Sequence, residues 1–422
     1  MNDLRRFDGA DTDTVRERPL TATESQFDDV PIIVHSHLRW DFVWQRPQQI
    51  LSRLAQRHPV LFLEEPVNSP DEPRLIISAT RSGVIRAVPA FPREIEEPDE
   101  KIDAVVRLLV DAVREDPALV GRFDSPVHWF YSPMTAPAVL ESFDSQGVVY
   151  DCMDELANFK FAPPTIAARE QFLLQRADLV FTGGHALYKA KSSQHRNTHF
   201  FGCGVDVQHF ARAHAPDTIV PVEVASLPKP VLGYFGVIDE RLDYELIELL
   251  AKQMPFASVV MVGPAAKVRP EDLPALPNVH WLGQRSYSEL PALVKGFDIC
   301  LMPFALNAAT QFINPTKTLE YLAARKPVVS TAVPDVVHGF SDLVDIGASR
   351  PDFVARIQQS LLAPDPLRAE RGVEKAQAAS WESIVASMRG HLLRTLGERD
   401  ARVAHHDRSA SLAAHDQRGV HP

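Results

Sequence analysis

The sequence predicts an α/β protein made of two doubly wound, Rossmann-like domains in series. Short apolar runs typical of buried strands alternate with amphipathic helix patterns, as expected for parallel sheets covered by helices. This alternation begins near Pro31 and begins again near Val231, and a chain of 422 residues is long enough for two domains. Two such domains would face each other across a cleft at the carboxyl ends of their strands, where open α/β folds bind ligands.

The composition is that of an ordinary globular protein, with 45% hydrophobic and 23% charged residues. A formal net charge of -11 argues against a nucleic-acid partner, which needs a basic face. Cys152, Cys203 and Cys300 lie far apart without a CxxC pair, so they predict neither a disulfide framework nor a zinc site. No apolar run reaches the roughly 18–20 residues of a membrane span, and the N-terminus lacks a signal-peptide core. We therefore expect a cytoplasmic protein.

The first domain is expected to occupy residues 29–210, after a polar and aperiodic lead-in at residues 1–28 that we expect to be disordered. Its predicted strands are Pro31–His35, Val60–Leu63, Val127–Tyr131, Val148–Asp151 and Leu179–Thr182. Helix patterns cover Trp44–Arg57 and Ile166–Arg176.

The second domain is expected at residues 231–375, after a linker at residues 211–230 that is rich in Ala, Pro and acids. Its predicted strands are Val231–Gly236, Val259–Val262, Val279–Leu282, Ile299–Met302 and Val328–Ser330. Helix patterns cover Tyr244–Gln253 and Ser288–Lys295. A last helix is predicted within residues 376–397, where Trp381, Val385 and Met388 repeat at helical spacing. Residues 398–422 are charged and aperiodic, so we expect a disordered tail.

The most informative stretch runs from Asn314 to Ser330 and has the pattern of a loop, a short helix and a buried strand. Asn314 suits an N-cap, and Pro315 suits the first helical position. Three main-chain amides would then be free to bind an anion, those of Thr316, Lys317 and Thr318. Glu320 follows about one turn later, where its carboxylate would accept hydrogen bonds from both hydroxyls of a ribose. The segment predicts a nucleotide site, with an ordinary capped helix as the alternative.

This segment resembles the donor-binding helix of family-4-like retaining glycosyltransferases (group 1), which have the GT-B fold. The resemblance rests on the pattern Pro-x-Lys-x-x-Glu-Tyr-hydrophobic-Ala-x-x-Lys-Pro-Val-Val. It implies that the second domain binds a nucleotide sugar and that the last helix crosses back to the first domain. It also implies sugar transfer with retention of anomeric configuration, without a metal or other cofactor.

The loop after the first strand of the second domain carries Gly236 and, five residues later, Arg241. A glycine allows close approach of a ligand, and an arginine can form two hydrogen bonds to a diphosphate. This resembles the Gly-x-x-x-x-Arg phosphate loop of the same enzymes, although Asp243 and Tyr244 stand where the family often has a lysine. The alternative is a surface arginine at a helix start.

Further donor-binding candidates lie at strand ends and in the loop before the donor helix. The resemblance places Gly263, Gly283 and Arg285 around the nucleotide base. Many related enzymes have a second acid eight residues before the glutamate, and this chain has Phe312 there. The polar candidates for the transferred sugar are Asn307, Thr310 and Gln311.

The acceptor-side candidates follow strands of the first domain. The run from Trp40 to Gln49 resembles a Trp-Asp-x-x-Trp-Gln-Arg-Pro-Gln motif of bacterial GT-B transferases that build surface polysaccharides, and its candidates are Trp40, Asp41, Trp44, Gln45 and Arg46. His37 is a further candidate; with His35 it would form a metal pair, but one packed and one exposed histidine is the reading we favour. Asp151, Asp154 and Glu155 would bond acceptor hydroxyls, or orient His35 or Arg46, or be structural.

These features together predict a hexosyltransferase-like enzyme with Arg241, Lys317 and Glu320 as its catalytic residues. It would move a sugar from a nucleotide sugar, expected to be a UDP-sugar, to a hydroxyl of a polysaccharide or glycolipid acceptor. Peripheral association with the inner face of the membrane stays open. The alternatives are a nucleotide-sugar 2-epimerase, which Asp151 and Glu155 would serve, and a non-catalytic nucleotide-sugar-binding partner, which Phe312 favours.

Overall fold

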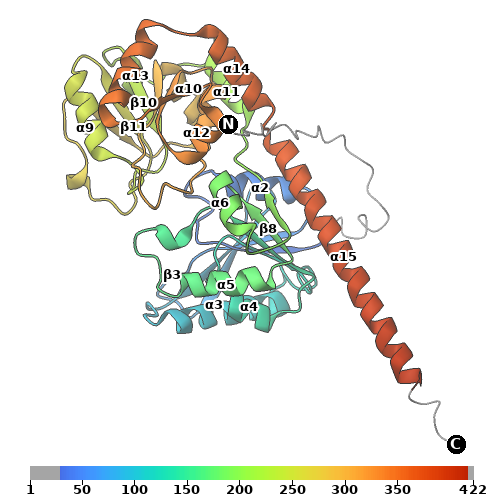
Figure 1. Ribbon diagram of the computed structural model, residues 1–422. Helices are drawn as coiled ribbons and strands as arrows, with labels where there is room; N and C mark the ends of the chain where they lie inside the picture. Colours follow the sequence, from blue (N-terminus) through green and yellow to red (C-terminus); the bar gives the residue numbers. More distant parts are fainter. Residues whose placement is uncertain (1–28, 417–422) are drawn as a thin grey trace, which may run out of the picture.

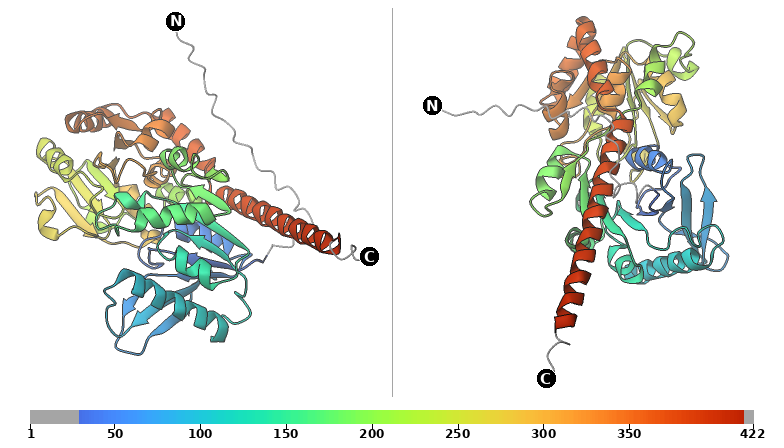
Figure 2. Two further views of the ribbon diagram at one scale, coloured as in Figure 1. Left: turned by 60° about the horizontal axis from the view of Figure 1, so that its bottom comes forward. Right: turned by 90° about the vertical axis from the view of Figure 1, so that its right-hand side faces the viewer.

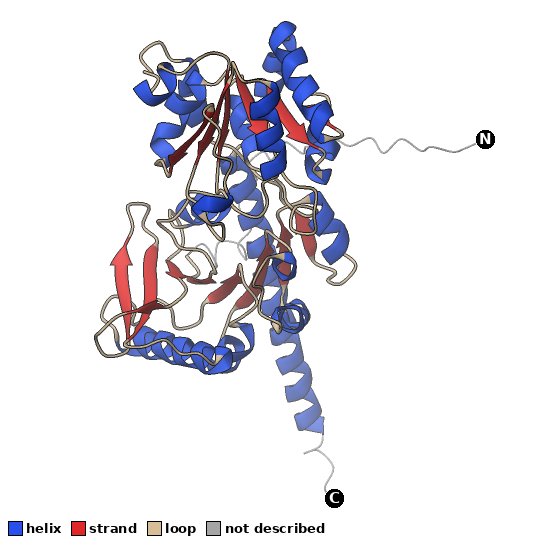
Figure 3. Ribbon diagram, turned by 90° about the vertical axis from the view of Figure 1, so that its left-hand side faces the viewer, coloured by secondary structure: helices blue, strands red, loops and turns tan. Residues whose placement is uncertain are grey.

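The computed structural model describes residues 29–416, with side chains described as far as residue 402. Two α/β domains lie one above the other, the first in blue to green and the second in yellow to orange (Figure 1). Each domain has its own sheet, and the two sheets are separate in Figure 3. The predicted fold class, two doubly wound α/β domains, is confirmed.

The first sheet has nine strands in the order β3-β5-β2-β1-β6-β7-β8-β9, with β4 paired antiparallel to β5. All other pairs are parallel. The strands are β1 Ile32–His35, β2 Val60–Leu63, β3 Val67–Asn68, β4 Arg74–Ala79, β5 Ile85–Phe91, β6 Val127–Phe130, β7 Gly147–Cys152, β8 Leu179–Thr182 and β9 Thr198–Phe200. The central strands are buried on both faces, which is why they have continuous Val, Ile and Leu runs.

The second sheet has six parallel strands in the order β12-β11-β10-β13-β14-β15. They are β10 Val231–Phe235, β11 Ser258–Val262, β12 Val279–Gly283, β13 Ile299–Met302, β14 Val328–Thr331 and β15 Asp345–Gly347. The order reverses between β10 and β13, as it does between β1 and β6 in the first sheet. Each reversal opens a crevice at the carboxyl ends of the strands, where ligands of this fold bind.

Helices cover both faces of each sheet. In the first domain they are α2 Arg46–Leu54, α3 Pro98–Glu115, α4 Ala136–Ser142, α5 Ile166–Arg176 and α6 His185–Lys191, with the short η1 Leu156–Asn158. The second domain begins with α7 Val207–Ala211, η2 Arg212–His214 and α8 Val222–Ala225. It continues with α9 Tyr244–Gln253, η3 Pro270–Asp272, η4 Tyr287–Glu289, α10 Leu290–Gly296, α11 Lys317–Ala323, α12 Pro334–Phe340, α13 Arg350–Leu362 and α14 Pro366–Gln377.

The last helix, α15 Trp381–Asp416, leaves the second domain and runs along the first (Figure 2). Its apolar side chains belong to the core between α2 and the first sheet, including Trp381, Val385, Met388 and Leu392. The helix continues to Asp416, whereas the sequence predicts that it ends at 397 and is followed by a disordered tail. The stretch after 397 has no proline and is rich in Ala and Arg, so it keeps helix propensity although its apolar periodicity has stopped. The rest of that expected tail, residues 417–422, and the expected lead-in, residues 1–28, lie outside the described residues.

A carboxylate of the second domain caps a helix of the first. Asp335, on α12, accepts hydrogen bonds from the main-chain amides of His185 (2.7 Å) and Ala186 (3.2 Å) at the start of α6. Beside this contact the rings of His185 and His338 stack with their centres 4.2 Å apart. The two domains are therefore joined directly, as well as through α15.

Within the described residues, 29–416, no helix is both long enough and apolar enough to cross a membrane.

We expect α15 to hold the domains together mainly through Trp381, which is 2% exposed. Trp381→Ala should lower the free energy of unfolding by about 3–5 kcal/mol, because a large buried ring leaves a cavity. The matched control is Leu367→Ala on α14, which is 74% exposed and should change stability by less than about 0.5 kcal/mol. Urea unfolding of both variants measures the difference, and equal effects would contradict this role of the helix.

Candidate functional site

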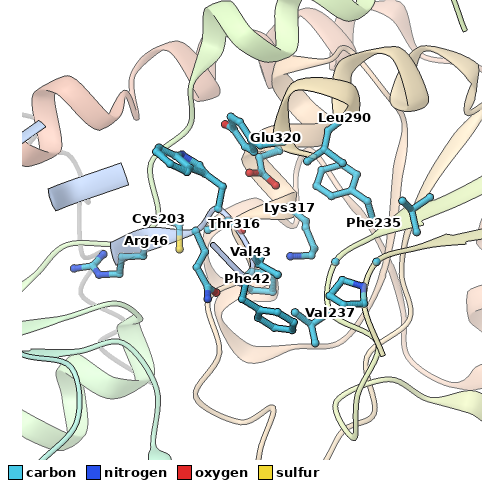
Figure 4. Close-up of a pocket in the computed structure, with 18 of the residues that line it drawn as sticks. Phe42, Val43, Arg46, Cys203, Phe235, Val237, Leu290, Thr316, Lys317 and Glu320 are labelled. Carbon is cyan, nitrogen blue, oxygen red and sulfur yellow. The ribbon is translucent and has the colours of Figure 1, made fainter. Parts of the chain in front are cut away.

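A cleft of about 660 Å³ lies between the two domains, at the carboxyl ends of both sheets. Figure 4 shows side chains from both domains around it, with Phe42 and Val43 from the first and Lys317 and Glu320 from the second, whereas the Arg46 side chain extends away from them. The sequence-predicted residues that line it are Trp40, Asp41, Trp44, Gln45, Arg46, Asp154, Gly236, Arg241, Gly263, Arg285, Pro315, Thr316, Lys317 and Glu320.

Two glycines form the floor of the cleft in the second domain. Gly236 and Gly263 follow β10 and β11 with φ of +149° and +148°, a backbone conformation that other residues rarely adopt. A Cβ on Gly263 would lie 1.8 Å from the carbonyl oxygen of Gly236, and a Cβ on Gly236 would lie 2.1 Å from Cε of Lys317. The glycines therefore allow the strand ends and Lys317 to pack closely, and any larger residue would displace them.

Lys317 and Glu320 stand side by side in the first turn of α11. Burial lowers the pKa of Lys317, although the nearby Glu320 carboxylate opposes this shift. Burial raises the pKa of Glu320 to about 7, against the effect of the Lys317 charge. No side chain or main-chain amide among the described residues donates a hydrogen bond to the Glu320 carboxylate. It is thus an acceptor held in a poorly solvated place without a protein donor.

The start of α11 differs from the prediction. The N-cap is Thr316 rather than Asn314, and the helix has only seven residues. The amide of Thr318 is not free, because it donates to the carbonyl of Pro315 at 3.1 Å, and the fully buried hydroxyl of Thr318 contacts Sδ of Met302. A tight turn at Pro315 thus replaces the first helical turn expected from the proline.

Arg241 lines the cleft but already has a partner. Its guanidinium forms hydrogen bonds with both carboxylate oxygens of Asp239, at 2.7–3.0 Å. Asp154 of the first domain also acts on Arg241: burial raises the pKa of Asp154 to about 6, and the charge of Arg241 opposes this rise. The Arg241 guanidinium carbon lies 5.9 Å from the centre of the Phe159 ring. Arg241 is therefore held in place by Asp239, a residue that the sequence did not mark.

The aromatic wall of the first domain is only partly available to a ligand. Trp40 is 4% exposed and packs edge-on against Trp44 and Phe62, so it is a core residue at the edge of the cleft. Trp44 is half-buried and its ring lies 6.2 Å from that of Tyr287 in the second domain. Gln49 adds a hydrogen bond of 3.2 Å to the Tyr287 hydroxyl. Trp44, rather than Trp40, presents an aromatic face to the cleft.

Arg46 and Asp151 form a buried ion pair, with Nη2 of the arginine and Oδ1 of the aspartate 2.9 Å apart. The Arg46 side chain is 2% exposed, and that of Asp151 is fully buried. Nε of Arg46 also bonds this carboxylate, and Nη1 donates to the carbonyl of Phe201 at 2.7 Å. Among the roles left open for Asp151, the structure shows that it orients Arg46. Asp151 does not line the cleft, and each nitrogen of the Arg46 guanidinium already donates to a protein oxygen.

Eight of the predicted residues do not line the cleft. Glu155 pairs with Lys191 at 2.8 Å. Asn307 and Thr310 bond to each other within their own loop, where the Thr310 hydroxyl also donates to the carbonyl of Ala305. The eight are His37, Asp151, Glu155, Gly283, Asn307, Thr310, Gln311 and Thr318. Asn307 and Thr310 therefore form hydrogen bonds that stabilise the turns of this loop, and they do not line the cleft. Asn and Thr side chains often bond to nearby main chain in this way, and the sequence position did not exclude it.

Phe312, in the place of the expected second acid, packs against the core of the first domain. Its carbonyl oxygen would be 3.1 Å from a Cβ on Gly184. The substitution thus replaces a charged group by an interdomain contact.

Residues that line the cleft without having been predicted include Met153, Gly183, Cys203, Gln284 and Ser286. Cys203 donates to the carbonyl of Asn314, with Sγ and O 3.1 Å apart. In the sequence, the only indication that Cys203 lies near a site is its position shortly after the strand β9, and no local motif marks it. Within residues 29–416 no group of three or more His, Cys, Asp or Glu side chains is arranged to hold a metal ion.

Comparison with known sequences agrees with this architecture. Residues 229–362 match the family described as glycosyl transferases group 1. Over 223 residues the chain is 30% identical to TuaH of Bacillus subtilis, a protein assigned to teichuronic acid biosynthesis as a glycosyltransferase. That match covers 49% of this chain and 55% of TuaH, so the chain spans about half the length of this relative.

Solved structures resemble nearly the whole described chain. Sucrose-phosphate synthase from Thermosynechococcus elongatus has a TM-score of 0.64 at 18% identity, over 87% of this chain and 99% of that one. An α,α-trehalose-phosphate synthase from Burkholderia vietnamiensis has a TM-score of 0.63 at 11% identity, over 88% and 100%. HepE from Anabaena, in complex with UDP, has a TM-score of 0.58 at 14% identity, over 86% and 99%. At these identities the likeness shows the fold, which is GT-B.

The raised pKa of Glu320 predicts a pH dependence of stability. Between about pH 4.5 and 7 the folded protein holds a proton that the unfolded chain loses, so stability should fall as pH rises through this range. Glu320→Gln cannot ionise and should gain up to about 3 kcal/mol over the natural protein between pH 4.5 and 8. Urea unfolding of both proteins at pH 5 and pH 8 measures this, and a constant difference would show that Glu320 does not titrate near pH 7.

Proposed function

We propose that the protein is a glycosyltransferase that moves a sugar from a UDP-sugar to a hydroxyl of a polysaccharide or glycolipid acceptor, with retention of configuration. The observation that carries this proposal is the grouping of Lys317, Glu320, Gly236 and Gly263 in one interdomain cleft. The lysine supplies positive charge, the glycines allow close backbone approach, and the glutamate supplies an acceptor for hydroxyl groups.

The diphosphate would lie over Gly236, within reach of Lys317 and Arg241, and the ribose would donate its hydroxyls to Glu320. In the transfer, the bond between the sugar C1 and the diphosphate oxygen breaks while the acceptor oxygen bonds to C1 on the same face. The acceptor proton passes to the departing diphosphate. The protein's part is to stabilise charge growing on the diphosphate, and the Asp239–Arg241 pair keeps the guanidinium in place without reorganisation.

The relatives support the nucleotide and the pathway class. HepE has been crystallised with UDP and with UDP and glucose, and TuaH is assigned to synthesis of a surface polysaccharide. A nucleotide sugar is therefore the expected donor here, and a glycan or lipid-linked glycan the expected acceptor. We infer a site of action in the cytoplasm, at the inner face of the membrane where such acceptors are built.

A second candidate, a non-catalytic nucleotide-sugar-binding partner, is favoured by Phe312, which packs between the domains where related enzymes have an acid. The two functions differ in turnover. A transferase releases UDP from a UDP-sugar when acceptor is added, whereas a binding partner protects the UDP-sugar without consuming it.

Glu320→Ala should weaken UDP binding by about 10- to 100-fold, the loss expected for hydrogen bonds to a charged group. Inorganic pyrophosphate has no ribose, so its affinity should change by less than about threefold. Isothermal titration of both ligands measures the two effects. Equal losses for UDP and pyrophosphate would remove the assignment of Glu320 to the ribose.

Trp44→Ala should cut transfer by about tenfold or more and leave UDP affinity within about threefold, if Trp44 covers the acceptor sugar. Trp281 is also half-buried but lies outside the cleft, so Trp281→Ala is the matched control for general loss of packing. Activity, UDP affinity and melting temperature are measured together. A fall in UDP affinity and melting temperature with Trp44→Ala that matches the control would show that Trp44 is only a packing residue.

A further inference from the structure

A second cavity, of about 310 Å³, lies in the first domain at the carboxyl ends of β1, β2 and β6. None of the residues that line it lines the interdomain cleft. Its volume is at the lower end of the range for small-molecule sites and suits a ligand of one or two sugar rings. The position is the strand-order reversal of the first sheet, where this class of fold binds ligands.

Three polar groups that line this cavity have buried atoms without a hydrogen-bond partner. They are Nδ1 of His35, Nδ1 of His37 and the hydroxyl of Thr135. His35 is only 2% exposed, so water does not replace the missing partner freely. Buried polar groups in proteins are nearly always paired, so three unpaired ones around one cavity indicate a ligand.

The partner of His35 shows what kind of ligand fits. Nε2 of His35 lies 3.0 Å from Nδ1 of His128, and one of these two nitrogens must carry the shared proton. Burial lowers the pKa of both rings, so both are neutral. If His35 donates to His128, its Nδ1 is an acceptor, and if it accepts, its Nδ1 is a donor. A hydroxyl group can satisfy either arrangement because it both donates and accepts.

The charge around the cavity argues against an anionic ligand. Of the three carboxylates in its lining, Glu64 is paired with Arg39 and Arg86, whereas Glu65 and Glu96 form no ion pair among the described residues. The one ammonium group of the lining, that of Lys101, lies 3.8 Å from the carboxylate of Glu94. Burial, and then the charge of Lys267 from the second domain, lower the pKa of His37 to about 4, so His37 adds no positive charge at neutral pH. The apolar part of the lining is Leu63, Ile102, Val105 and Met134. Hydroxyls around an apolar ring face, without negative charge, describe a neutral sugar.

The cavity and the cleft are close enough to serve one chain-like substrate. His37 lines the cavity and Trp40 lines the cleft, and three residues span at most about 11 Å. Glu64, in the cavity wall, accepts a hydrogen bond of 3.0 Å from the amide of Trp40, which fixes the segment between them. The influence of Lys267 on His37 and on Glu65 places this part of the cavity towards the second domain.

We propose that this cavity is a carbohydrate subsite that holds an uncharged pyranose unit of the acceptor, beyond the unit that receives the transferred sugar. Thr135, His35 and His37 bond its hydroxyls, and the carboxylates exclude uronate and phosphorylated units. The proposal rests on the function proposed above, because it assigns the cavity to the acceptor of that reaction.

The test is ligand-observed NMR of the full chain with D-glucose and D-glucuronate, alongside titration with UDP. The natural protein should bind glucose at least about tenfold more tightly than glucuronate. Thr135→Val removes the hydroxyl group. It does not remove a helix cap, because the Thr135 side chain forms no hydrogen bond to the first main-chain amides of α4. This variant should bind glucose about fivefold or more weakly than the natural protein, and its affinity for UDP should change by less than about twofold. Thr316→Val, the same change in the cleft, should leave glucose unchanged.

A second variant does not depend on the packing around Thr135. Glu65 and Glu96 are exposed residues, and Glu65→Gln combined with Glu96→Gln should raise glucuronate affinity relative to glucose by about fivefold or more. Absence of glucose binding, or glucose binding lost in Thr316→Val and kept in Thr135→Val, would overturn the subsite. Failure of UDP to bind the natural protein would instead overturn the proposed function, so the two failures are distinct.

Discussion

The interdomain cleft depends on holding the carboxyl ends of two sheets against each other. Neither domain alone has both the charged groups of α11 and the aromatic groups that follow β1. The apposition is fixed by Asp335, which caps α6 across the domain boundary, and by α15, whose apolar side complements the first domain. Phe312 adds packing on the same side. A displacement of one domain would open the cleft and separate Lys317 from the wall that faces it.

The cleft is costly to maintain without a ligand. Lys317 and Glu320 are both desolvated. Burial lowers the pKa of the lysine and raises the pKa of the glutamate, so it favours the neutral form of each. Their mutual attraction offsets only part of this cost. A ligand that brings anionic oxygens to the lysine and hydroxyl donors to the glutamate would restore the interactions that burial removed. The same desolvation strengthens those interactions once they form, so the cost of the empty site and the affinity of the filled one have a single cause.

The parts of the structure that local pattern determines were predictable from the sequence. Buried strands such as β1 and β10 are continuous apolar runs, and the periodic apolar face of α15 predicted the last helix, whose crossing to the first domain only the resemblance implied. The β4–β5 hairpin was missed, although Gly83 at its turn has a φ of +86°. β4 is half-exposed and mixes polar with apolar residues, and the apolar run of the buried β5 is interrupted by Arg86 and Pro89. Boundaries set by one hydrogen bond, such as the start of α11 at Lys317, were two residues off.

The site residues also fall into two groups, those that a local sequence pattern predicts and those that depend on contacts between distant residues. Gly236, Lys317 and Glu320 were found because close approach, charge and spacing are encoded within a few residues of one another. The partners of Arg46 and Arg241 differ in this respect. Asp239 is only two residues from Arg241, but nothing local shows which of several neighbouring acids the guanidinium will choose. Asp151 is 105 residues from Arg46, and only the pairing of β1, β6 and β7 brings them together. Long-range electrostatic pairs cannot be derived from spacing alone.

The Arg46–Asp151 pair also constrains what the acceptor side can recognise. The Arg46 guanidinium donates to the Asp151 carboxylate and to the carbonyls of Phe201 and Gly202, so its charge is already paired within the protein. What remains at the first-domain wall is the face of Trp44, the amide of Gln45 and the carboxylate of Asp154. Aromatic faces, amides and carboxylates bind hydroxyl-bearing rings better than phosphates or uronates. The positive charge of the cleft is thus confined to the second domain, where the donor's diphosphate would lie, and the wall opposite suits an uncharged sugar.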